Sequence, residues 1–173
     1  AALCQEAGLV PIVEPEVLMN GSHTIERCYE VTDRTLQMTF GQLEKQNVSM
    51  EGMVLKPNMV VSALDCSVQA PIEQVAEMTL KCLKKNVPSS VTGIAFLSGG
   101  QSSDLATAHL NAMNSMDNDL PWNLTFSYGR ALQQDALNIW EGTNRNDAQE
   151  AFLNRAKNNG LASIGKCPEE LTQ

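Results

Sequence analysis

Hydrophobic residues in this chain alternate between short continuous runs and longer stretches with a period near 3.6 residues. The short runs are rich in Val and Ile and stop at Pro, Gly or charged residues, which is typical of buried parallel strands. They predict strands at residues 8–13, 53–55, 91–97 and 124–127. The periodic stretches predict helices over residues 22–46, 71–85, 102–113, 130–140 and about 147–158, and residues 61–70 read as a loop.

The order of these elements is strand then helix, four times over. Repeated βα units form a parallel sheet whose ligands gather at the carboxyl ends of the strands. Four units in 173 residues give about 43 residues each. Eight units of that size would close a (β/α)₈ barrel of roughly 350 residues, so the pattern predicts an α/β fold that is half of a TIM barrel. A doubly wound open sheet of four strands is the alternative that periodicity leaves open.

Composition and charge narrow the classes of partner. The chain is 43 % hydrophobic, enough for a buried core, and carries 20 acidic against 12 basic residues, for a net charge of -8. An acidic protein has no basic field to collect nucleic acid or an anionic membrane, so neither is expected as a partner. The apolar runs are also too short for a transmembrane helix.

Cysteine and histidine usage gives no metal signature. The five cysteines include no C-x-x-C pair, and neither His23 nor His109 has a second ligand at metal spacing. We therefore expect reduced thiols and no bound metal.

Charged residues follow the first two predicted strands. Glu14 and Glu16 are two residues apart, and carboxylates that share a site favour protonation of one of them, which suits proton transfer. They could equally be two solvated acids at a strand end. Lys56 follows an apolar strand and precedes Pro57, so burial would favour a neutral amine able to attack a carbonyl. The alternative is a lysine whose ammonium group simply reaches solvent.

Two later strands end in segments suited to phosphate. Ser98-Gly99-Gly100 offers unobstructed backbone N–H groups where a strand leads into a helix, although Gly-Gly is also ordinary turn chemistry. Gly129-Arg130 repeats the arrangement and adds a guanidinium. The two tryptophans are expected to pack, Trp122 at a strand entry and Trp140 in the core.

Four segments in register resemble class I fructose-bisphosphate aldolase, in its carboxy-terminal half. They are VPIVEPEVL at 10–18, LKPNMV at 55–60, AFLSGGQS at 95–102 and LTFSYGRALQ at 124–133. The resemblance extends over essentially the whole chain. It implies the last four units of a (β/α)₈ TIM barrel in residues 1–160, followed by a tail at 161–173.

The resemblance implies a carbon–carbon lyase that reversibly cleaves fructose 1,6-bisphosphate into dihydroxyacetone phosphate and glyceraldehyde 3-phosphate. The family works through a Schiff base, without metal or other cofactor. Motif by motif, Lys56 looks like the Schiff-base lysine, Glu14 like the acid/base carboxylate and Glu16 like its partner. The positions that look like phosphate-binding residues are Ser98, Gly99, Gly100, Ser127, Gly129 and Arg130.

The family also implies a sugar-phosphate substrate, a homotetramer, and a cytoplasmic or plastid-stromal place in glycolysis, gluconeogenesis or carbon fixation. Its first four units, which bring an aspartate and two lysines to the same site, have no counterpart in these 173 residues. Two alternatives therefore stay open. One is a truncated, non-catalytic half-barrel that acts only through assembly, and the other is a different Schiff-base lyase.

Overall fold

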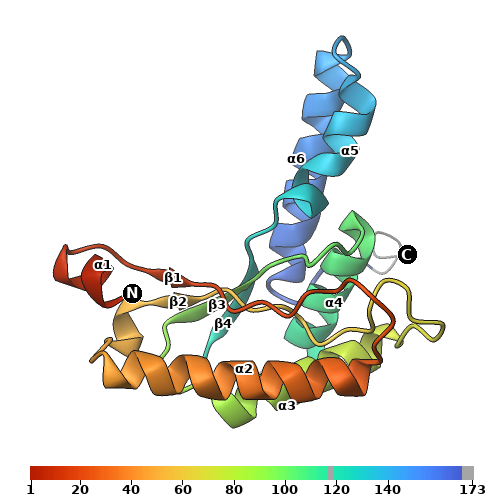
Figure 1. The fold of residues 1–173 in the computed structure, drawn as a ribbon. Coiled ribbons are helices and arrows are strands. Elements are labelled where there is room, and N and C mark those ends of the chain that lie inside the picture. The colour runs from red at the N-terminus through yellow and green to blue at the C-terminus, as the bar shows by residue number, and fades with distance from the viewer. Residues whose placement is uncertain (117–118, 169–173) are drawn as a thin grey trace.

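The strands form one parallel sheet in chain order, as seen in a computed structural model that describes residues 1–116 and 119–168 (Figure 1). Within these residues the sheet order is β1-β2-β3-β4. The strands are β1 (Ile12–Val13), β2 (Val54–Leu55), β3 (Gly93–Phe96) and β4 (Asn123–Phe126). The helices are α1 (Ala2–Glu6), α2 (Ile25–Lys45), α3 (Ile72–Asn86), α4 (Ser103–Met116), α5 (Arg130–Trp140) and α6 (Arg145–Ala162), with a 3₁₀ turn η1 (Met50–Gly52).

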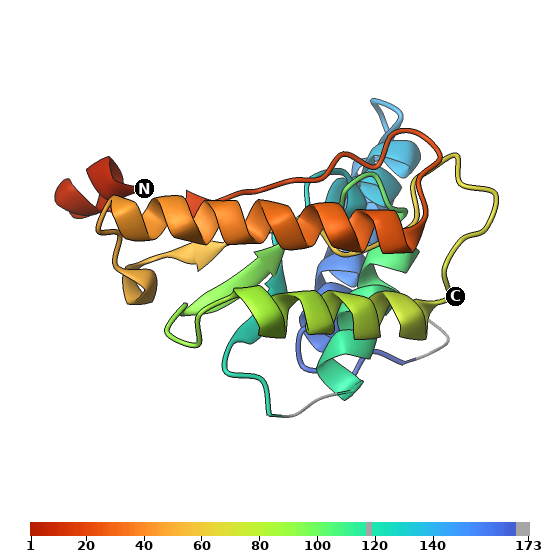
Figure 2. The ribbon, with the colours of Figure 1, turned by 60° about the horizontal axis from the view of Figure 1, so that its bottom comes forward.

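The position of the helices distinguishes the two predicted architectures. A doubly wound sheet reverses its strand order and carries helices on both faces. Here the order never reverses, and α2 and α3 lie together against one face of the sheet (Figures 1 and 2). The chain is therefore half of a (β/α)₈ barrel, as predicted, and not an open doubly wound sheet.

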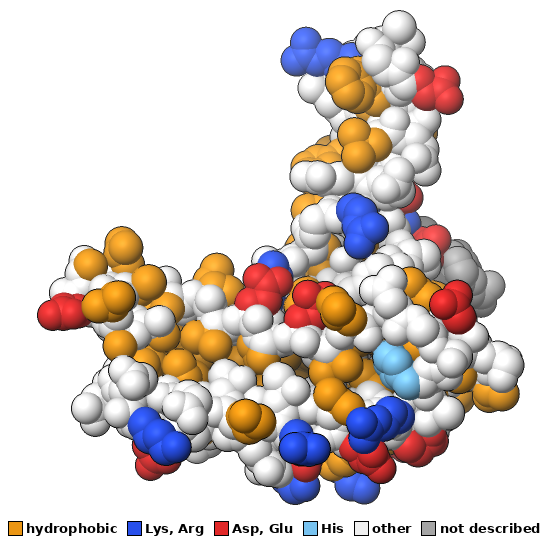
Figure 3. All heavy atoms as spheres, in the orientation of Figure 1, with side chains coloured by type: hydrophobic (Ala, Val, Ile, Leu, Met, Phe, Trp, Pro, Cys, Tyr) orange, Lys and Arg blue, Asp and Glu red, His pale blue; other side chains and the backbone are white. Residues whose placement is uncertain are grey.

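Strand register gives the sheet a covered face and an open face. Leu55, Ile94 and Leu124 lie side by side in the register and are at most 2 % exposed, because they face the helices. The adjacent row begins with Ile12, which pairs with Val54 and is 62 % exposed. Hydrophobic side chains accordingly line the hollow beside the upright α5–α6 pair (Figure 3).

Side-chain caps mark the starts of α2, three residues later than predicted, and of α4, within one residue of the prediction. The Thr24 hydroxyl accepts a hydrogen bond from the backbone N–H of Arg27 at the start of α2. Ser102 does the same for Leu105 at the start of α4. In the part of the chain that the structure describes, no helix is long and apolar enough to cross a bilayer.

Several predicted boundaries differ from the observed ones. The first three strands are shorter than their hydrophobic runs, because only part of each run pairs with a neighbouring strand. The fourth strand begins and ends one residue earlier than predicted. The helix α1 and the turn η1 were not predicted, and both are too short to show a clear period. The last helix is longer than expected at both ends.

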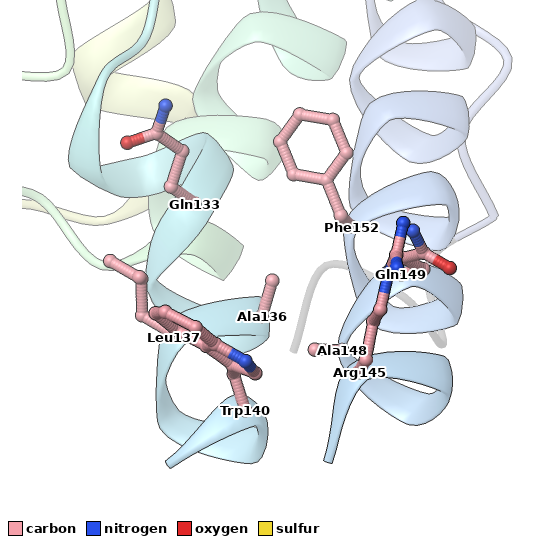
Figure 4. Close-up of a pocket in the computed structure, with 8 residues that line it drawn as sticks. All are labelled: Gln133, Ala136, Leu137, Trp140, Arg145, Ala148, Gln149 and Phe152. Atoms are coloured by element: carbon pink, nitrogen blue, oxygen red, sulfur yellow. The ribbon is translucent and has the colours of Figure 1, made fainter. Parts of the chain in front are cut away.

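The two tryptophans have opposite environments. Trp122 is 5 % exposed and its indole N–H donates to the carbonyl of Pro88 over 2.8 Å, as expected for a packed residue at a strand entry. The prediction that Trp140 lies in the core is wrong, since it is 47 % exposed. It lines an apolar groove of about 470 Å³ between α5 and α6 (Figure 4). Helical spacing identified its apolar face but not what covers that face.

The segment at residues 165–167 packs closely on α4. α6 extends to Ala162, so the predicted boundary at residue 160 falls within its last turn, and the division into barrel and tail stays a prediction. Residues 169–173 of that predicted tail lie outside the described part. Gly165 has a left-handed φ of 65°, and an added Cβ would lie 2.8 Å from the backbone of Asn114.

Substitution at Gly165 should therefore destabilise the fold. Gly165→Ala combines left-handed strain with a backbone clash, and we expect it to lower the free energy of unfolding by about 2 kcal/mol or more. Gly160→Ala is the matched control, because Gly160 lies in α6 with nothing within 4 Å of an added Cβ. That change should be neutral or stabilising by up to about 1 kcal/mol. Chemical denaturation of both variants measures the difference, and equal stabilities would contradict the packing described.

Candidate active site

The carboxyl ends of the four strands meet around one cavity of about 500 Å³. This is the edge where parallel sheets bind ligands. It brings together nearly all of the predicted site residues. Those that line it are Glu16, Lys56, Ser98, Gly99, Gly100, Ser127, Gly129 and Arg130.

The remaining predicted residue, Glu14, reaches the same place through Lys56. The Lys56 ammonium nitrogen Nζ lies 3.1 Å from Glu14 Oε1, and the lysine side chain is 21 % exposed. The backbone N–H of Lys56 donates to the carbonyl of Val13, which continues the strand pairing one residue beyond β2. This bond holds the amine and the carboxylate on neighbouring strand ends, so a proton can pass between them.

A buried asparagine joins the loops that carry these groups. Asn58 is 3 % exposed, and its Oδ1 accepts from the backbone N–H of Val17 over 3.0 Å. Its amide nitrogen donates to Thr32 and to the carbonyl of Met59. Asn58 therefore fixes the Glu14–Glu16 loop against the Lys56 loop. Its role could not be predicted, because nothing local in LKPNMV indicates a partner 41 residues away.

Two glycines shape the loop after β3. Gly99 and Gly100 have φ angles of 56° and 79°, in the left-handed region that glycine tolerates best. Because glycine has no side chain, the backbone N–H groups here are unobstructed, and the loop leads directly into α4. The Gln101 amide donates to the carbonyl of Ser98 over 2.9 Å and closes the loop from behind.

His109 supports this loop through Gln101. Its Nδ1 lies 2.6 Å from Gln101 Oε1. Burial lowers the pKa of His109 to about 4, so the ring is neutral near pH 7 and Nδ1 donates to the amide oxygen. Nothing in the sequence around His109 indicates this contact, because Gln101 lies eight residues earlier, in the loop before α4.

The loop after β4 completes the opposite wall. The backbone N–H of Ser127 donates to the carbonyl of Phe96 over 2.8 Å, which places it beside the end of β3. The buried Tyr128 hydroxyl donates to the carbonyl of Ala106 in α4. Arg130 is the first residue of α5 and lines the cavity next to Gly100.

The arrangement combines an amine paired with a carboxylate and, across the cavity, a glycine loop with an arginine. Among the residues described there is no group of three or more His, Cys, Asp or Glu able to hold a metal ion. A half-buried lysine beside a proton carrier can form an imine with a carbonyl compound, and a glycine loop with an arginine can hold a phosphate. The fold and site thus define a class, the (β/α)₈-barrel proteins with a lysine–carboxylate pair at the carboxyl ends of their strands.

Comparison with known proteins gives the family within that class. Residues 1–173 match the family described as fructose-bisphosphate aldolase class-I, and the chain belongs to it. It is 57 % identical over 169 residues to a probable fructose-bisphosphate aldolase class 1 of Xanthomonas axonopodis pv. citri. It is 50 % identical over 166 residues to the cytoplasmic isozyme of fructose-bisphosphate aldolase from Spinacia oleracea. The match covers 96 % and 95 % of this chain, respectively.

A solved structure agrees with the same family. Fructose-bisphosphate aldolase from Plasmodium falciparum, in complex with TRAP and a small-molecule inhibitor, matches with a TM-score of 0.93 at 45 % identity. The match covers 97 % of this chain but 49 % of that one. The first two relatives are likewise covered over 50 % and 46 % of their lengths. The chain therefore spans about half the length of the proteins it matches.

The buried histidine gives a pH-dependent stability. His109 has a folded-state pKa of about 4, below the value of about 6.5 for an unfolded chain. As pH falls from about 6.5 toward 4, the unfolded state binds a proton that the folded state does not, so stability is lost by roughly 1 kcal/mol per pH unit. His109→Asn should remove this component and flatten the dependence. Thermal unfolding of the parent protein and the variant between pH 7.5 and 4.5 measures it, and parallel curves would contradict the assignment.

Proposed function

We propose that this chain carries the Schiff-base half of a class I fructose-bisphosphate aldolase, which reversibly cleaves fructose 1,6-bisphosphate. The observation that carries the proposal is the pairing of Lys56 with Glu14 over 3.1 Å at the cavity that also holds the glycine loop and Arg130. Because the chain spans half of its relatives, the activity is proposed for the full natural protein that contains it.

In the proposed reaction, Lys56 acts as the nucleophile. Nζ first passes a proton to Glu14, and the neutral amine attacks the ketone carbon of the substrate. Glu14 returns the proton to the hydroxyl of the adduct, which leaves as water, and a protonated imine forms between Nζ and that carbon. The iminium withdraws the electron pair of the C3–C4 bond as that bond breaks, while the C4 hydroxyl loses its proton and becomes the aldehyde. Glu14 is the proposed proton carrier, since its carboxylate already lies within hydrogen-bonding distance of Nζ. Glu16 lines the same cavity and is proposed as its partner.

The phosphate of the ketone half is assigned to the opposite wall. Ser98, Gly99 and Gly100 supply backbone N–H groups, and Arg130 supplies a guanidinium beside Ser127 and Gly129. Holding the phosphate there fixes the carbonyl carbon near Nζ. Such positioning lowers the activation free energy, because the translational and rotational entropy of the substrate is lost on binding and not in the reaction step.

The remaining features are proposed from the family. We propose a sugar-phosphate substrate, a homo-oligomer of the tetrameric kind, no metal or other cofactor in the reaction, and no nucleic-acid or membrane partner. A cytoplasmic location is supported by relatives named as cytoplasmic or cytosolic isozymes. We also propose residues 1–160 as the functional half-barrel and 161–173 as its tail.

A test of the lysine uses borohydride trapping. In the full natural protein, reduction in the presence of dihydroxyacetone phosphate should attach the ketone at Lys56. Lys56→Met should abolish both labelling and cleavage, because methionine has no amine. Mass spectrometry of the labelled peptide and a cleavage assay measure the two effects.

Lys85→Met is the control for that experiment. Lys85 pairs with Asp33 at the end of α3, away from the cavity, and its loss should leave labelling unchanged. Full activity in Lys56→Met, or activity abolished by a chelator such as EDTA, would overturn the proposal. Absence of labelling in the parent protein would favour the non-catalytic alternative, and labelling without cleavage of the bisphosphate would favour another Schiff-base lyase.

The role of Arg130 predicts a different kinetic signature. Arg130→Ala removes a phosphate contact made in substrate and transition state alike, so KM should rise by about tenfold or more while kcat changes less. Arg34→Ala, on the exposed side of α2, changes the charge by the same amount and should alter neither. Steady-state kinetics measure both variants, and a loss confined to kcat would argue against a phosphate role.

A further inference from the structure

The helices that carry the two phosphate-binding loops are joined by one buried arginine. Arg155 projects from α6, and its side chain is 10 % exposed. Its Nη2 donates to Asp104 Oδ1 over 2.6 Å, and its Nε donates to Asp135 Oδ2 over 2.8 Å. Asp104 belongs to the first turn of α4 and Asp135 to α5, so a single guanidinium bridges both helices.

The position of this bridge connects it to the proposed phosphate site. Asp104 lies four residues after Gly100, and Asp135 lies five residues after Arg130. A second cavity, of about 290 Å³, separates the two helix starts and is lined by all four of these residues. Gly100 and Arg130 also line the cavity at the strand ends, so the two cavities share the wall that is assigned to phosphate.

Both carboxylates carry charge that opposes phosphate binding. Unpaired, Asp104 and Asp135 would repel each other across the gap, repel a bound dianion and compete for Arg130. The forked guanidinium satisfies both at once, which an ammonium group cannot do with the same geometry. Thr107 accepts a third hydrogen bond from Nη1 over 3.3 Å and further fixes the fork.

We propose that Arg155 is a positioning residue for phosphate recognition. It holds the starts of α4 and α5 at the spacing that lets the 98–100 loop and Arg130 grip one phosphate, and it neutralises the two carboxylates beside them. It contacts no substrate itself. The inference rests on the proposed function and adds a residue to which neither the resemblance nor the motifs assign a role.

The test compares a phosphorylated ketone with an unphosphorylated one, which separates phosphate binding from the reactivity of the lysine. In the full natural protein, Arg155→Gln should raise the concentration of dihydroxyacetone phosphate needed for half-maximal borohydride trapping by about tenfold to a hundredfold. Trapping of unphosphorylated dihydroxyacetone at Lys56 should stay unchanged, because it makes no use of the phosphate wall. Inhibition by inorganic phosphate should weaken in parallel with the first effect.

Three variants complete the design. Arg145→Gln makes the same charge change at the exposed start of the same helix and should behave as the parent protein. Arg155→Lys should recover part of the affinity, since it restores the charge but not the fork. Asp135→Asn breaks the ion pair that ties α5 to Arg155, which weakens trapping, but it also removes a negative charge beside the phosphate, which favours trapping. It should therefore shift trapping in the same direction by a smaller factor, and it provides the measurement if Arg155→Gln does not fold.

The outcomes distinguish this inference from the function on which it rests. If the parent protein traps neither ketone, the proposed function fails and the inference falls with it. If the parent protein is labelled by both ketones, and Arg155→Gln and Asp135→Asn need the same concentration of dihydroxyacetone phosphate for half-maximal trapping as Arg145→Gln does, the inference alone is overturned. Equal weakening of trapping with both ketones would also overturn it, because a residue that only supports the fold does not discriminate between them.

Discussion

The register of four parallel strands is the constraint on which the site depends. Each strand pairs with the next in chain order, so four loops that are distant in sequence open at one edge. Pairing continues past the strands themselves, from Lys56 to Val13 and from Ser127 to Phe96, which fixes the loops and not only the sheet. A slip of one residue would turn Leu55 toward the open face and Lys56 toward the helices. The row of hydrophobic residues that faces the helices, with Leu55 and Ile94 fully buried, makes such a slip unfavourable and so keeps Lys56 on the side of the cavity.

Much of this arrangement could be predicted, because the end of a buried parallel strand can be recognised in the sequence. A Val- and Ile-rich run that stops at a proline locates a carboxyl end, and Glu14 and Lys56 stand at such points. What could not be predicted are contacts between side chains far apart in the chain. Asn58 reaches back 41 residues to Val17, and Arg155 reaches 51 residues to Asp104. Periodicity also misjudged Trp140, because it shows that a helix has an apolar face without showing what lies against it.

The open face of the sheet agrees with the length of the chain's relatives. Parallel sheets are ordinarily covered on both faces, yet Ile12 is 62 % exposed at the start of the open row. The apolar groove between α5 and α6 is likewise uncovered (Figure 4). These surfaces lie on a chain that spans about half of each protein it matches. The four strand ends nonetheless surround one cavity, so Lys56, Glu14 and the loop at 98–100 are all held by contacts within these residues.

The same register has a consequence for how the chain acquires its shape. The first paired positions of neighbouring strands are 42, 39 and 30 residues apart, as in Ile12 with Val54 and Gly93 with Asn123. Each pairing must close a long loop, and the conformational entropy is lost before the stabilising contacts between the strands have formed. Sheets of this kind are therefore slow to form. A strand emerging during synthesis must wait with its backbone unpaired until the next helix and strand have been made. During that interval the exposed strand edge can pair with another chain. The tendency to aggregate is therefore set by the timing of translation and not by the stability of the finished sheet.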